Sequence, residues 1–165
     1  MTDNATHTVT DETDQTRPST DTIDPIATTP AHDAGLLLLR VTLGGLMLFH
    51  GIAKLKGVDF IKQTLAGKGL PEFIAYGVYV GEILVPLLMI VGLFTRISSA
   101  IFAFNMLVAV WLAHSGDLLS LNKHGGWAIE LPALYGFGAL ALVLLGPGQW
   151  ALSRLVLGKT TGPLA

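Results

Sequence analysis

Ionisable side chains interrupt the long apolar segments of this chain, and their types could support ligand binding or proton transfer. Six of them are the candidates for such a site: Arg40, His50, Lys54, Glu82, Arg96 and Glu130. An ionised group at the middle of a bilayer costs about 2.5–3.5 kcal/mol on insertion scales. Because of this cost, we expect these side chains to face the protein interior and to pair with one another.

The first apolar segment places its basic residues on one side. At about 100° per residue, five residues fall within an arc of about 120° of one helix: Arg40, Gly44, His50, Gly51 and Lys54. The small residues of this face would let a neighbouring helix approach closely. We interpret Glu82, near the middle of the next apolar segment, as the counter-ion of Arg40 or Lys54. Glu130 is the second acid expected opposite these bases.

The neighbours of Glu82 predict an irregular helix. Gly77 and Gly81 form a small-residue motif just before it, and Pro86 follows one turn later. Proline kinks a helix and frees a carbonyl group, which is tolerated in a membrane where the backbone faces protein or a water-filled cavity. Without a basic partner, Glu82 would be neutral and could carry a proton. The sequence does not decide whether Glu82 forms an ion pair or carries a proton.

A structural role competes with a functional one at each position. Arg40 could extend its side chain to the membrane interface, and Glu82 could form an ion pair that only stabilises the fold. For His50 and His114 we favour interfacial or hydrogen-bonding roles. A quinone is the cofactor we consider first, and axial ligation of haem by two histidines comes after it. No catalytic residue is assigned and no metal site is predicted.

The composition indicates a membrane protein. The chain has 165 residues, of which 51% are hydrophobic and only 13% charged, whereas soluble domains are about a quarter charged. It has no cysteine, which excludes disulfides, thiolate metal sites and a thiol relay within the chain. No phosphate-binding loop, nucleophile elbow or dinucleotide fingerprint is present, and nothing favours nucleic-acid binding.

Four apolar segments are long enough for helices that cross a bilayer, which takes about twenty residues. They are residues 34–55, 73–94, 96–114 and 127–145. The predicted fold class is therefore an all-α integral membrane four-helix bundle. In the first connection, Val58, Ile61 and Leu65 share one helical face and predict a short amphipathic helix at the interface. The counts of Lys and Arg in the loops leave the membrane orientation open.

The chain divides into three parts. Residues 1–33 contain seven acidic residues and one basic residue and are rich in Thr and Asp, so we predict a disordered acidic tail. Residues 34–155 form the transmembrane domain, and residues 156–165 a short C-terminal tail. The acidic tail is expected to be solubilising; docking of a partner is the alternative.

Taken in order, several short motifs resemble the DoxX family of membrane proteins. They run from residue 35 to residue 154 and comprise Arg40, His50-Gly51-x-x-Lys54, Gly69-Leu70-Pro71, Glu82, Gly92-Leu93-Phe94-Thr95-Arg96, Glu130, Gly146-Pro147-Gly148 and Trp150. The resemblance implies a bacterial four-helix membrane bundle associated with quinone-linked redox chemistry or oxidative stress. It also implies that the six candidate residues form the functional positions, with no agreed catalytic mechanism.

We therefore expect a multi-pass protein of the cell (cytoplasmic) membrane that acts as an accessory component of a membrane redox system. Its partners would be the lipid bilayer, redox enzymes and, in a homo-oligomer, further copies of the chain. One alternative is a small proton-coupled carrier that uses the same carboxylates. Another is a non-catalytic scaffold that recruits soluble enzymes. Whether the chain is an enzyme, and which ligand it binds, are open at this point.

Overall fold

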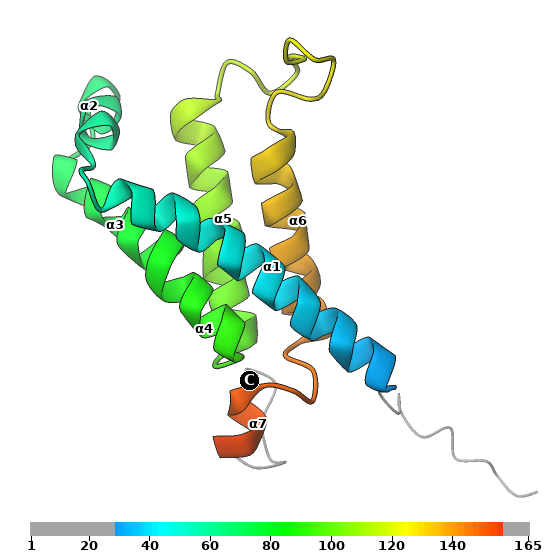
Figure 1. The fold of residues 1–165 in the computed structure, drawn as a ribbon. Helices are drawn as coiled ribbons and strands as arrows, with labels where there is room; N and C mark the ends of the chain where they lie inside the picture. Colours follow the sequence, from blue (N-terminus) through cyan, green and yellow to red (C-terminus); the bar gives the residue numbers. More distant parts are fainter. Residues whose placement is uncertain (1–28, 157–165) are drawn as a thin grey trace, which may run out of the picture.

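The computed structural model describes residues 29–156, which are helical with connecting loops (Figure 1). The elements are α1 (Pro30–Lys54), α2 (Asp59–Gly67), η1 (Glu72–Tyr76), α3 (Gly77–Tyr79), η2 (Val80–Leu84), α4 (Val85–Val91), α5 (Thr95–Ala113), α6 (Glu130–Leu145) and α7 (Leu152–Val156). Within this part of the chain there is no strand, which confirms the all-α class. The predicted tails fall largely on residues 1–28 and 157–165, outside the described residues.

Three of the helical stretches are long and apolar enough to cross a membrane, which supports a membrane protein with several spans. They are Pro30–Lys54, Glu72–Val91 and Thr95–Ala113. The fourth apolar helix, α6, has 16 residues and is therefore about 24 Å long, against a hydrocarbon core of about 30 Å. Its crossing of the bilayer stays a prediction. Large apolar side chains such as Leu38, Phe104 and Leu144 lie exposed on the outer faces, as contact with lipid requires.

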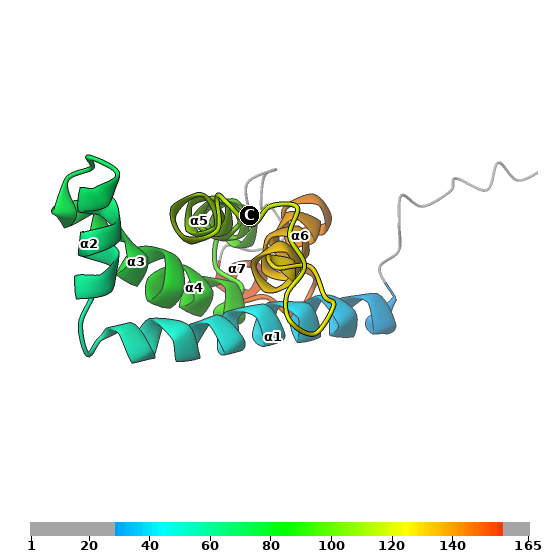
Figure 2. The same cartoon turned by 90° about the horizontal axis from the view of Figure 1, so that it is seen from above.

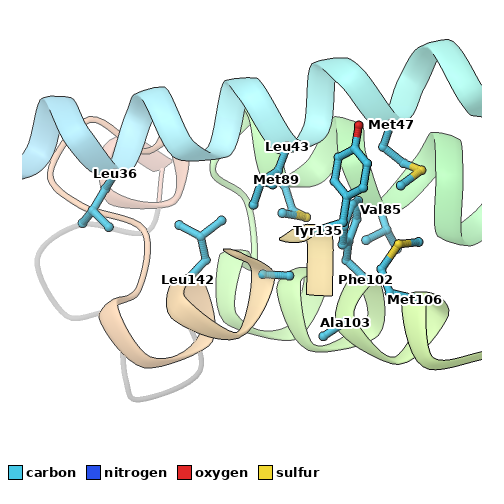
Figure 3. Close-up of a cluster of buried hydrophobic side chains, with 11 residues drawn as sticks. Leu36, Leu43, Met47, Val85, Met89, Phe102, Ala103, Met106, Tyr135 and Leu142 are labelled. Carbon is cyan, nitrogen blue, oxygen red and sulfur yellow. The ribbon is translucent and has the colours of Figure 1, made fainter. Parts of the chain in front are cut away.

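The long helices pack around one apolar core. Helix α1 lies along η2 and α4 and also contacts α6, while α5 packs between α4 and α6. Seen from above, α5 and α6 are viewed along their axes whereas α1 lies across them (Figure 2). Leu43 and Met47 of α1 meet Met89 of α4, Phe102 of α5 and Tyr135 of α6 in this core (Figure 3).

Helix α1 begins four residues earlier than predicted. Pro30 occupies the first turn, where its missing N–H costs nothing, and the Thr29 hydroxyl accepts a 3.3 Å hydrogen bond from the His32 backbone N–H. Asp33, which we had placed in the acidic tail, lies in the helix and is buried. It accepts a 2.8 Å hydrogen bond from the Gln149 backbone N–H, so it joins the two ends of the domain.

The predicted small face of α1 makes the closest helix contacts in the core. A Cβ atom on Gly44 would lie 2.9 Å from the Pro86 carbonyl oxygen, and one on Gly51 would overlap the carbonyl oxygen of Glu82. In the second span, Gly81 packs against the Asn105 side chain, whereas Gly77 has no atom within 4 Å of such a Cβ. Only one half of the predicted Gly77–Gly81 motif therefore serves packing.

The first connection contains the predicted amphipathic helix, α2. Val58 and Leu65 are buried with Ala75 of η1, while Phe60 is exposed on the other side. Lys62 lies 3.7 Å from Asp59 and over the ring of Tyr76. Hydrogen bonding to Tyr76 and attraction to its phenolate form raise the pKa of Lys62, so this lysine is cationic at neutral pH.

Replacing Gly51 with alanine tests the closest of these contacts. We expect Gly51→Ala to lower the stability by about 1–3 kcal/mol, since the added methyl group would push α1 away from the Glu82 backbone. Gly45→Ala is the matched control, because a Cβ there meets open space on the same helix. Thermal unfolding of both variants in detergent micelles measures the difference. Equal unfolding temperatures would show that the close contact is not required.

Candidate functional site

Lys54 at the end of α1 and Glu82 in η2 form an ion pair. The Lys54 ammonium donates a hydrogen bond to Glu82 Oε1. Glu82 is only 5% exposed, whereas the Lys54 side chain is 36% exposed. The second carboxylate oxygen, Glu82 Oε2, is buried and has no hydrogen-bond partner within residues 29–156. The pair therefore confirms one of the two predicted partners of Glu82 and leaves one acceptor atom free.

The local backbone explains why Glu82 points toward α1. Pro86 lacks an N–H and disturbs the helix on its N-terminal side, and the chain widens there into the π-helical segment η2. In this segment the Val85 N–H bonds to the Val80 carbonyl, five residues earlier. Such π turns are frequent at functional sites. The Glu82 carbonyl lies against Gly51, one helical turn before Lys54, so the close backbone contact also aligns the two charges.

The ion pair borders a small pocket of about 110 Å³ between α1, η2, α5 and α6. Its polar lining consists of His50, Lys54, Glu82 and Tyr135. Its apolar lining consists of Met47, Met106, Leu131 and Pro132. The His50 and Tyr135 rings meet edge to face with their centroids 6.4 Å apart. In Figure 3 the Tyr135 hydroxyl points toward α1. Three hydrogen-bond donors and one acid thus surround a small cavity.

Arg40 faces the protein interior, as predicted, but its hydrogen-bond partner is not an acidic side chain. Its side chain is fully buried, so it does not extend to the interface, and it is not paired with Glu82. It donates a 2.8 Å hydrogen bond to the Trp150 carbonyl oxygen, while its Nε and Nη1 atoms have no partner within the described residues. Gly92, at φ +75°, has no side chain, and Arg40 Nη1 occupies the space that a Cβ atom would take there. Arg40 therefore fixes the C-terminal segment against α1.

Arg96 and Glu130 also lie outside the pocket. Arg96 donates a 3.4 Å hydrogen bond to the carbonyl oxygen of Leu144 in the last turn of α6, where helical carbonyls lack partners. Glu130 is exposed and accepts a 3.5 Å hydrogen bond from the Asn122 side chain. Our prediction that Glu130 faces the bases of the first span is wrong, because Glu130 lies at the start of α6 and contacts the preceding loop.

Of the six predicted residues, His50, Lys54 and Glu82 come together. His114 remains apart from His50, with its Nδ1 atom 3.9 Å from the Asp117 carboxylate. In the described part of the chain, no group of three His, Cys, Asp or Glu residues is placed to hold a metal ion. Tyr135 also lines the pocket but is not among the residues predicted from the sequence. Its hydroxyl in the middle of an otherwise apolar segment was the available signal, because a buried tyrosine usually needs a polar neighbour.

The fold and the pocket define an all-α membrane protein in which a partly exposed lysine pairs with a buried glutamate of the next span. A model of the DoxX family matches residues 35–115. The chain belongs to the DoxX family.

Individual relatives agree with this membership. "Putative oxidoreductase CatD" of Bacillus subtilis (strain 168) is 36% identical over 78 residues, which are 47% of this chain and 58% of CatD. An uncharacterized protein of Haemophilus influenzae is 32% identical over 125 residues, 72% of this chain and 88% of that protein. "Inner membrane protein YphA" of Escherichia coli (strain K12) is 27% identical over 127 residues, with the same two shares. No solved structure matches the chain.

A double-mutant cycle tests the ion pair. Lys54→Met should lower the stability by about 1–3 kcal/mol, since it leaves the Glu82 carboxylate buried without a cation. Glu82→Gln should cost less, because Lys54 can still reach water. In the double variant Lys54→Met/Glu82→Gln, the loss should be smaller than the sum of the single losses, as for residues in contact. Unfolding temperatures in micelles provide the comparison, and strictly additive losses would show that the two residues do not interact.

Proposed function

We propose that this chain is a multi-pass protein of the cell membrane, with α6 as a fourth crossing, and an accessory component of a membrane redox system. In this proposal the pocket beside Lys54 and Glu82 holds the head group of a quinone. The observation that carries the proposal is the pocket itself, where three donors and an acid meet beside apolar side chains at the edge of the helical core. Intramembrane ionisable residues that face the protein interior commonly mark ligand or proton pathways.

The pocket lining fits a quinone head group. Lys54, His50 and Tyr135 can donate hydrogen bonds to its two carbonyl oxygens, and the side chains of Met47 and Met106 can contact the faces of its ring. A bound quinone would accept two electrons and two protons, and the electrons would come from a partner redox enzyme. The chain has no cysteine, so thiols of this chain do not carry them.

Glu82 is the residue suited to hold the transferred proton. Its Oε1 atom accepts from Lys54, and the free Oε2 atom can bind a proton. His50 is exposed on one side and lines the pocket on the other, so it can exchange protons with the surroundings. Lys54 holds the Glu82 carboxylate in place beside the pocket by donating a hydrogen bond to Oε1.

The names of two relatives support this proposal. CatD is named a putative oxidoreductase, and YphA is named an inner membrane protein. The first name favours redox chemistry over a purely structural role, and the second favours the cell membrane as the location.

Removing the charge of Glu82 tests the proposed function. We expect Glu82→Gln to weaken the binding of the reduced form, a short-tailed benzoquinol, about tenfold or more, since a quinol hydroxyl can donate to the free Glu82 Oε2 and one hydrogen bond to a charged group is worth about 1.5–3 kcal/mol. The measurement is equilibrium binding to the purified protein in detergent. Glu72→Gln, an exposed acid at the start of η1, is the control that should bind as the wild type does.

Equal affinities for the wild type and Glu82→Gln would contradict the proposal. If the wild type binds no quinone at all, the same preparation in proteoliposomes distinguishes the rivals. If the wild-type protein shows proton-coupled flux and Glu82→Gln abolishes it, a small carrier is favoured. If the wild-type protein shows no flux, a scaffold is favoured.

A further inference from the structure

A second cavity, of about 360 Å³, lies between α5 and α6. Its lining is apolar and includes Ala103, Leu107 and Val110 of α5 with Ala133, Gly136 and Phe137 of α6. Leu107 and Phe137 are 69% and 66% exposed, so this groove opens to the outer face that we place against lipid. Gly136 keeps the groove open, because it presents no side chain to the space beside Met106.

The groove and the polar pocket share two lining residues, Met106 and Pro132. Met106 is buried in the core and Pro132 lies in the first turn of α6. These two side chains therefore separate the apolar groove from the polar pocket, which opens to the surface at the exposed residues His50 and Leu131. Methionine is unbranched and has three rotatable bonds, so Met106 can move without displacing a helix.

The two volumes suggest a division of roles. Pockets that enclose a whole small-molecule ligand measure about 300–1,000 Å³, so the 110 Å³ polar pocket can take only a head group. The groove, at about 360 Å³, is large enough for several carbons of an apolar chain. A ligand that spans both cavities must have a polar head joined to an apolar tail, which is the chemistry of a molecule dissolved in the bilayer.

We propose that the groove between α5 and α6 binds the apolar tail of the ligand whose head group occupies the polar pocket, with the ligand passing over Met106 and Pro132 from one cavity to the other. The inference rests on the proposed function, and it adds a preference for long-tailed, isoprenoid-type quinones. Lipid is as apolar as the groove, so the tail gains affinity through packing in a defined position and the expected effect is modest.

The test fills the groove from α6. Gly136→Leu and Ala133→Leu place a branched side chain in the cavity from two successive turns, so that one variant remains informative if the other fails to fold. Gly45→Leu and Ala100→Leu are the controls, since position 45 faces open space and Ala100 lies exposed on α5. In lipid nanodiscs, the affinity of each variant is measured for a long-tailed quinone and for a tailless benzoquinone.

We expect the groove variants to weaken long-tailed quinone binding about fivefold while leaving tailless benzoquinone binding unchanged, and the controls to match the wild type for both. The partition of a quinone into the bilayer is the same for every variant, so it does not affect the ratio of the affinities of two variants for that quinone. Unchanged affinity for the long-tailed quinone in folded groove variants would overturn the tail site and leave the head-group site standing. If the wild type binds neither quinone, both the proposed function and the tail site are wrong.

Discussion

The contact between Gly51 of α1 and the backbone of Glu82 is the constraint on which the rest of the site depends. A Cβ atom on Gly51 would overlap the Glu82 carbonyl oxygen, so the two helices can approach this closely only at glycine. Lys54 follows one turn later on the same face and meets the Glu82 carboxylate. Without the close approach, the Glu82 carboxylate would be buried without a cation beside it, and an unpaired buried charge is costly.

The irregular backbone around Glu82 leaves room for a pocket beside this close helix contact. Pro86 and the π-helical segment η2 widen the second span on the side that faces α1, and a pocket remains beside the ion pair. The opposite end of the domain is closed by different contacts. Arg40 and Asp33 bind the backbone at Trp150 and Gln149. One end is thus fixed by buried hydrogen bonds, while the other keeps a cavity with an unsatisfied carboxylate oxygen.

The sequence was sufficient for the helices and for part of the site. Periodicity and segment length predicted the three long spans and α2, and the shared helical face of Gly51 and Lys54 followed from spacing alone. Pairing of Glu82 with Lys54, and not with Arg40, could not be predicted, because both bases lie on that face and the choice depends on depth along the neighbouring helix. The position of Glu130 depended on the loop before α6, where Asn122 binds it, and helical periodicity carries no information about a loop.

Photo-crosslinking can show whether a head group binds beside Lys54 and Glu82. A benzoquinone that carries a light-activated azide would be irradiated with the wild-type protein in nanodiscs, and the labelled peptides would be identified by mass spectrometry. We expect adducts on the residues that line the polar pocket, His50 in α1 and Tyr135 in α6 above all. Labelling confined to outward-facing residues such as Leu38 and Leu144, at the level given by a probe without the quinone ring, would show that no head group binds there.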